Sequence, residues 1–139
     1  MSTEQNKALA RRLFEEGINQ RNWAVLDELC TPDFVHHNAA LTLQGLESVK
    51  QFLSMYLTAF PDVQLTIEDM VAEGDTVVIR HTFRGTHKGD LMGIPPTGKQ
   101  VNVTGIDIIR TAGGKIVEQW TNADDLGAMQ QLGVVPSMG

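Results

Sequence analysis

The chain has 139 residues, a formal net charge of −6 and an isoelectric point near 5.1, which suits one domain with enough material for a core and a pocket. The acidic balance argues against a nucleic-acid partner, because nucleic-acid binding depends on clustered Lys and Arg. A single cysteine, Cys30, rules out an internal disulfide. No segment approaches the roughly 20 apolar residues of a membrane helix, and the first residues lack a signal-peptide pattern, so we expect no membrane association and a cytoplasmic protein.

The first part of the chain predicts helices. Ser2 or Thr3 can cap a first helix, and Asn22 can cap a second, shorter one. Residues 34–37 then read as a short extended piece, after a proline that disfavours helix. The spacing of apolar residues is most clearly helical over residues 46–60.

The rest of the chain predicts strands. Gly74-Asp75 is a two-residue hairpin signal between the first two of them. Residues 124–132 predict a closing helical turn or two. Helices followed by an antiparallel meander indicate an α+β fold with helices on one face of a sheet, and the lack of repeats or linkers predicts one domain over residues 1–139. The four long strands cover residues 63–73, 76–86, 99–111 and 115–123.

The most informative stretch connects the second and third of these long strands, from Arg84 to Lys99, with the sequence RGTHKGDLMGIPPTGK. Glycines and prolines normally mark a solvated connection. This one also carries Leu91, Met92 and Ile94, which have little reason to lie in open water. We therefore expect the loop to fold back over the domain, and loops held by a rigid scaffold commonly carry function.

This stretch resembles the GTHxGxxxGxPPTG signature of the SnoaL-like polyketide cyclase, or ester cyclase, family, within the nuclear transport factor 2-like superfamily. The resemblance implies a cone-shaped, curved antiparallel sheet of about four long strands plus a short one. It places the N-terminal helices on the concave face, where they close a deep apolar cavity. It also implies a homodimer formed through the uncovered sheet face. The resemblance covers nearly the whole chain and is strongest over residues 80–133.

Alternation along the last predicted strand places Ile116, Glu118, Trp120, Asn122 and Asp124 on one face. An aromatic ring beside carboxylates and an amide suits a pocket wall that binds substrate. The alternative is a sheet edge near solvent with one packed Trp. In SnoaL-like cyclases, a Trp in the last strand is followed by the acid that acts as catalytic acid/base, and Trp120 and Asp124 match that W-x-x-x-D spacing.

Asp107 lies in the middle of an apolar strand, where an unpaired carboxylate is costly. One interpretation is a structural ion pair with Arg80 or Arg110. The other is a catalytic group across the cavity from Asp124, in a family whose polyketide cyclases often pair the acid with a histidine. Arg80 could also orient a carbonyl or carboxylate of the substrate.

Histidines can act as acids or bases near neutral pH, although most are simply packed or exposed. His37 resembles the family's histidine in its DFVxHN context. The adjacent His36 points to the opposite side, and the sequence does not show which of the two faces the cavity. His87 belongs to the loop signature and should shape the cavity mouth, with Met92 in an apolar lid. His81 is interpreted as packing or interface.

These patterns predict a cofactor-independent acid/base enzyme, with no metal, that acts on a small apolar metabolite containing a carbonyl group. The reaction that the resemblance implies is an intramolecular aldol ring closure. Asp124 would move the proton, since a carboxylate in a dry setting can act as a base, and Asn122, Arg80 or a histidine would donate to the oxyanion. The alternatives are a non-catalytic binding module of the same fold and an enzyme similar to ketosteroid isomerase or epoxide hydrolase.

Overall fold

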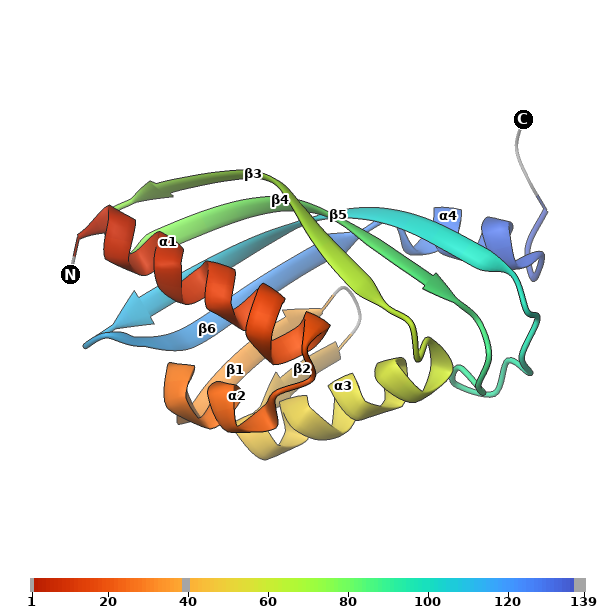
Figure 1. The fold of residues 1–139 in the computed structure, drawn as a ribbon, viewed down its shortest axis with the longest axis horizontal. Coiled ribbons are helices and arrows are strands. Elements are labelled where there is room, and N and C mark those ends of the chain that lie inside the picture. The colour runs from red at the N-terminus through yellow and green to blue at the C-terminus, as the bar shows by residue number, and fades with distance from the viewer. Residues whose placement is uncertain (1, 39–40, 137–139) are drawn as a thin grey trace.

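The computed structural model describes residues 2–38 and 41–136. Figure 1 shows α1, α2 and α3 on the concave side of a curved sheet, with α4 at the far end of the sheet. No helix in these residues combines the length and apolar character needed to cross a membrane. The helical segments are α1 (Thr3–Arg12), the π-helical η1 (Leu13–Asn19), α2 (Trp23–Leu29), α3 (Leu46–Ala59) and α4 (Asp125–Leu132).

The sheet has six strands in the order β2-β1-β6-β5-β4-β3. Neighbouring strands are antiparallel except β1 and β6, which pair in parallel. The sheet is therefore mixed, where an antiparallel sheet was predicted, and β2 was not predicted. A four-residue strand gives little sequence signal, and strand direction depends on distant pairing. The strands are β1 (Cys30–Asn38), β2 (Leu41–Gln44), β3 (Gln64–Glu73), β4 (Thr76–Thr86), β5 (Gln100–Ala112) and β6 (Lys115–Ala123).

Local signals explain where the helices begin and end. Ser2 caps α1: its hydroxyl accepts a hydrogen bond from the Gln5 N–H, and the Gln5 side chain accepts one from the Ser2 N–H. Asn22 precedes α2 as predicted, although its side chain makes no capping hydrogen bond. Asp124 caps α4, and Gly133 ends it in the left-handed conformation that favours glycine.

A β-bulge in β6 changes which side chains face the helices. Ile116 lies opposite Thr111, whereas Glu118 lies opposite Arg110, so Val117 is an extra residue in β6. Each residue after the bulge therefore faces the side opposite to the one that alternation from Ile116 predicts. This shift decides which residues of β6 reach the concave side.

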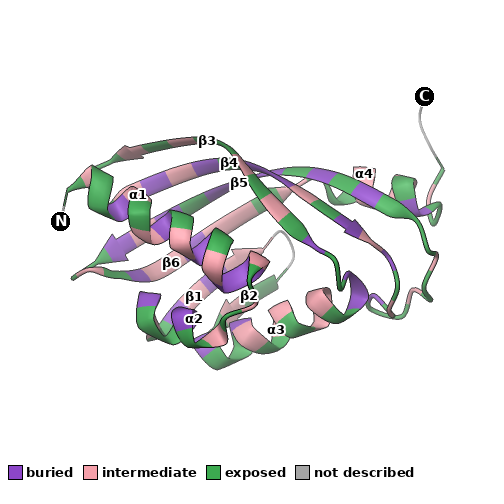
Figure 2. Ribbon diagram, viewed as in Figure 1, coloured by how far each residue is buried: buried purple, intermediate pink, exposed green. Residues whose placement is uncertain are grey.

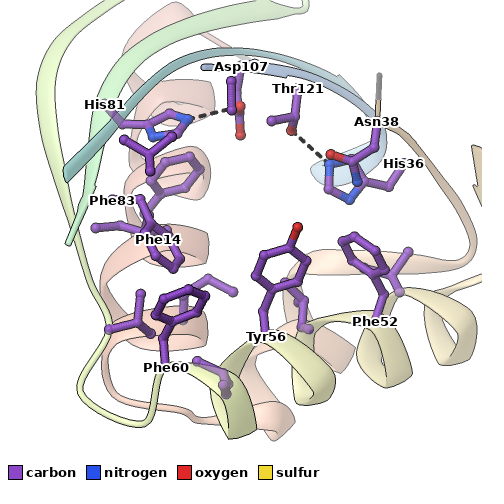
Figure 3. Close-up of a pocket in the computed structure, with 18 of the residues that line it drawn as sticks. Phe14, His36, Asn38, Phe52, Tyr56, Phe60, His81, Phe83, Asp107 and Thr121 are labelled. Atoms are coloured by element: carbon purple, nitrogen blue, oxygen red, sulfur yellow. Dashed lines mark hydrogen bonds and ion pairs between the residues drawn. The ribbon is translucent and has the colours of Figure 1, made fainter. Parts of the chain in front are cut away.

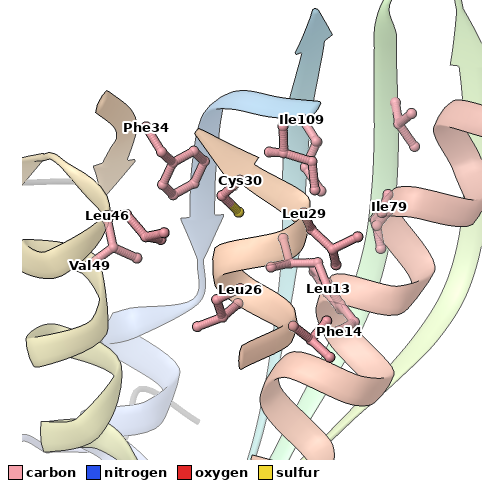
Figure 4. Close-up of a cluster of buried hydrophobic side chains, with 14 residues drawn as sticks. Leu13, Phe14, Leu26, Leu29, Cys30, Phe34, Leu46, Val49, Ile79 and Ile109 are labelled. Carbon is pink, nitrogen blue, oxygen red and sulfur yellow. The ribbon is translucent and has the colours of Figure 1, made fainter. Parts of the chain in front are cut away.

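The core has two parts, and Figure 2 shows the buried residues alternating along β5. The smaller part lies at the loop end of the sheet, where Leu91 packs with Phe60 and Leu132. The predicted folding back of the loop is confirmed for Leu91. The larger part joins the helices to the sheet (Figure 4) and contains Ala10, Leu13, Phe14, Val25, Leu26, Leu29, Cys30, Phe34, Leu46, Val49, Val77, Ile79, Ile109 and Ile116.

Candidate active site

A pocket of about 200 Å³ lies between the helices and the concave face of the sheet (Figure 3). Aliphatic and aromatic side chains form most of its wall. Such a pocket with a few convergent polar groups is the usual form of a small-molecule site. Its polar lining residues are His36, Asn38, His81, Asp107, Gln119 and Thr121 on the sheet, and Tyr56 and Asp125 on helices.

Asp107, on β5, is the buried carboxylate of this pocket, with only 3% of its surface exposed. Its Oδ1 lies 3.1 Å from His81 Nε2 on β4, and its Oδ2 accepts a hydrogen bond from Gln119 Nε2 on β6 at 2.6 Å. These two bonds offset much of the cost of burying a carboxylate. The alternative ion pair with Arg80 or Arg110 is wrong, because these arginines pair with other carboxylates.

Gly105 makes room for the imidazole that contacts Asp107. A Cβ atom at position 105 would lie 2.9 Å from His81 Cε1 and 3.0 Å from His81 Nε2. Contacts that close would push the ring away from the carboxylate. A glycine inside a strand often marks such a close approach.

His36 supplies a second polar group on the sheet side of the pocket. Its Nε2 lies 2.8 Å from the Thr121 hydroxyl on the neighbouring β6. Burial lowers the pKa of the His36 imidazole, so the ring is neutral at neutral pH. The pocket thus contains a neutral imidazole in addition to the Asp107 carboxylate.

Asp107 lies in the pocket as predicted, but Asp124 does not. The strand ends at Ala123, and the chain turns into α4. Asp124 is exposed and its Oδ1 accepts a hydrogen bond from the Gly127 N–H at 2.9 Å, as an N-cap. The predicted inward orientation of Asp124 is wrong, and its neighbour Asp125 lines the pocket instead.

The other residues predicted from the last strand, Glu118, Trp120 and Asn122, are absent from the pocket wall. Beyond the bulge they lie on the outer face of the sheet, so the predicted pocket wall is wrong. The Trp120 ring stacks on His37 with 5.2 Å between centroids, and His37 Nε2 lies 2.7 Å from Glu118 Oε2. His36 lines the pocket and His37 does not, which settles what the sequence left open and places the candidate catalytic His37 outside the pocket.

The remaining predicted substrate-binding residues also lie outside the pocket. Arg80 is exposed on the outer face and donates to Asp69 at 2.7 Å. His87 is fully buried under the loop, where its Nδ1 accepts a hydrogen bond from the Thr97 N–H at 3.2 Å. Met92 is 59% exposed. His87 therefore holds the loop in place, and Met92 does not form the predicted lid.

Sequence reasoning missed His81 and Gln119 as pocket residues. His81 shares a strand face with the apolar Ile79 and Phe83, and a histidine on such a face was an available signal. Gln119 was hidden by the bulge, which local patterns do not reveal. The described residues contain no group of three or more His, Cys, Asp or Glu side chains that could hold a metal ion.

A family model for SnoaL-like polyketide cyclases matches residues 8–132. The chain belongs to the SnoaL-like polyketide cyclase family. Two similar proteins are named aklanonic acid methyl ester cyclases. DauD of Streptomyces sp. (strain C5) is 31% identical over 111 residues, which cover 78% of this chain and 67% of DauD. DnrD of Streptomyces peucetius is 31% identical over 108 residues, which cover 76% of this chain and 72% of DnrD.

Solved structures of similar proteins share the fold of this SnoaL-like chain. A candidate SnoaL-like polyketide cyclase from Jannaschia sp. CCS1 has a TM-score of 0.90 and 29% identity, covering 96% of this chain and 95% of its own. AclR of Streptomyces galilaeus, named as a candidate hydroxylase, has a TM-score of 0.87 and 30% identity. The match covers 99% of this chain and 87% of AclR. The cyclase relatives support a cyclase-type enzyme, while AclR is named for a different reaction.

Proposed function

We propose that this SnoaL-like protein is a cyclase-type acid/base enzyme that acts, without a cofactor, on an apolar small molecule containing carbonyl groups. The observation that carries the proposal is the Asp107 carboxylate, buried in a mostly apolar pocket with both oxygens hydrogen bonded. The family match and the cyclase names of its relatives support the class of reaction.

Asp107 is the base in this proposal. It takes a proton from a carbon beside a carbonyl group, and the electrons of the broken C–H bond form an enolate. The enolate carbon then attacks a second carbonyl carbon of the same molecule, which closes a ring by a new C–C bond. The resulting alkoxide takes the proton back from Asp107, so the enzyme returns to its starting state.

The neighbours of Asp107 are positioning residues. Hydrogen bonds from His81 and Gln119 hold the carboxylate in one orientation and suit its ionised form, which is the form that accepts a proton. The apolar walls exclude water and can fold a flexible substrate so that its two reacting carbons meet. Orientation of this kind contributes a large part of the rate of an intramolecular reaction.

Proton exchange at an activated carbon tests the first step without knowledge of the natural substrate. The probe is ethyl 2-methyl-3-oxo-3-phenylpropanoate, a β-keto ester with one acidic C–H between two carbonyl groups. In D₂O the wild-type protein should accelerate loss of the NMR signal of this proton well above the rate without protein. Saturable binding of the ester with no acceleration of exchange would instead favour a binding module.

The homodimer remains a prediction, and we propose that it forms through the outer sheet face. Ile106 and Ile108 of β5 are both exposed there, next to the stacked Trp120 ring. The double variant Ile106→Lys and Ile108→Lys should therefore reduce the mass measured by light scattering from two chains to one. The control is Leu41→Lys, an exposed leucine on the edge strand β2. A wild-type mass of one chain would contradict the prediction.

A further inference from the structure

Tyr56 of α3 faces the polar side of the pocket from the helical side. Figure 3 shows its hydroxyl pointing into the pocket, toward the sheet residues Asp107 and Thr121. Its ring is held by aromatic neighbours, with centroid distances of 5.1 Å to Phe52 and 6.5 Å to Phe83. Within residues 2–38 and 41–136, the hydroxyl makes no hydrogen bond. Tyr56 is only partly buried. Its O–H group, which would normally have a hydrogen-bond partner in a protein interior, is therefore available to a ligand.

Proton removal beside a carbonyl group requires a hydrogen-bond donor for the carbonyl oxygen, and the Asp107 carboxylate cannot be that donor. Negative charge develops on the carbonyl oxygen, and a hydrogen-bond donor aimed at that oxygen usually supplies a large part of catalysis. Two of the donors expected from the sequence, Asn122 and Arg80, lie outside the pocket. The enzyme proposed here therefore needs another donor.

The other polar groups of the pocket are already engaged or closed off. His81 and Gln119 bind the carboxylate of Asp107, and His36 pairs with a hydroxyl of β6. The Asn38 amide nitrogen and the Nδ1 atoms of His36 and His81 have no partner in the described part of the chain, but all three atoms are fully buried. Among these side chains, the Tyr56 hydroxyl is the donor that points into open space.

We propose that Tyr56 is a catalytic residue that donates a hydrogen bond to the carbonyl oxygen of the substrate as Asp107 removes the neighbouring proton. The inference rests on the proposed function of Asp107. No proton leaves Tyr56 in this step: the proton moves from carbon to Asp107, the electron pair of the C–H bond moves into the enolate, and the enolate oxygen accepts the hydrogen bond.

The surroundings of Tyr56 keep its hydroxyl protonated. Burial raises the pKa of the Tyr56 phenol, and the nearby negative charge of Asp125 raises it further. A phenol that retains its proton can donate a hydrogen bond throughout the reaction. Asp125, which also lines the pocket, therefore helps to keep the donor protonated.

The experiment uses 4-nitrophenol, whose phenolate oxygen resembles the enolate oxygen and whose absorbance distinguishes phenol from phenolate. One ring suits the pocket, since a dry cavity of roughly 150 Å³ holds benzene. Binding is measured in the Asp107→Asn variant, because the neutral amide imitates the carboxyl group after it has taken up the proton. This variant should bind the phenolate more tightly than the wild-type protein, whose carboxylate repels it.

Adding Tyr56→Phe to Asp107→Asn should weaken phenolate binding about 10- to 100-fold, as expected for the loss of a hydrogen bond to a charged group. Binding of 4-nitroanisole, which has no ionisable oxygen, should change little, because the phenyl ring of Phe keeps the packing. In the otherwise wild-type protein, Tyr56→Phe should lower kcat for exchange of the β-keto ester by about 10²- to 10³-fold with little change in KM.

Phenolate binding that is unchanged by Tyr56→Phe would overturn the inference, as would an equal loss of affinity for 4-nitroanisole. Other outcomes distinguish a failure of the proposed role of Asp107 from a failure of the proposed role of Tyr56. If Asp107→Asn exchanges the ester at the wild-type rate while Tyr56→Phe still weakens phenolate binding, the proposed base is wrong and the donor stands. If Asp107→Asn stops exchange and Tyr56→Phe does not slow it, the base stands and the donor is wrong.

Discussion

Replacement of Asp107 by Asn should slow exchange of the β-keto ester by about 10³-fold or more, near the upper range for the loss of a general base. Asn has nearly the same shape as Asp, and its amide can still hydrogen bond to His81 and to Gln119 after rotation of the Gln119 amide. It cannot accept the proton. The variant should therefore keep the circular dichroism spectrum and the thermal midpoint close to those of the wild-type protein.

Asp124→Asn is the matched control, because the sequence pattern places the catalytic acid at that position. The structure places Asp124 outside the pocket, as the N-cap of α4. Asn is as good an N-cap as Asp, so Asp124→Asn should retain both stability and the wild-type exchange rate. Lost exchange in Asp124→Asn together with a normal rate in Asp107→Asn would reverse the two assignments.

Ile109→Ala should have the largest effect on stability among these variants. Ile109 is fully buried on the inner face of β5, within the larger core cluster (Figure 4). Loss of its buried methyl groups and the remaining cavity should lower the free energy of unfolding by about 2–5 kcal/mol. Urea unfolding followed by circular dichroism measures this change, with the m-value expected to stay constant.

Ile108→Ala provides the control one residue away. Ile108 is 40% exposed on the outer face of the same strand. Both substitutions carry the same loss of intrinsic strand preference, up to about 1 kcal/mol, so the difference between them reports burial. We expect Ile108→Ala to cost less than about 1 kcal/mol in dilute solution, where pairing of two copies does not contribute. Equal effects at the two positions would contradict the assignment of the strand faces.

Much of the local structure follows from nearby residues. The predicted strands 76–86 and 115–123 match β4 and β6, and the predicted helix 46–60 ends one residue beyond α3. These boundaries depend on caps, hairpin turns and apolar spacing, which are interactions between residues close in sequence. The loop signature also placed the chain in its family, which the match over residues 8–132 confirms.

The inner face of the site was only partly predictable. Asp107 could be identified because burying a carboxylate in an apolar strand is costly unless it is paired or has a function. Its partners could not be read from the sequence, since His81 and Gln119 come from strands on either side of β5. Tyr56 follows the apolar spacing of α3, and this spacing does not show where its hydroxyl points.

The sequence by itself determined the helices, the four long strands, the return of the loop through Leu91, and the family. The tertiary structure alone decided the parallel pairing of β1 with β6, the bulge at Val117, and the turn that sends Asp124 outward. The reason is that alternation assigns faces only while a strand stays regular. One extra residue, stabilised by pairing with a distant strand, reverses every face that follows.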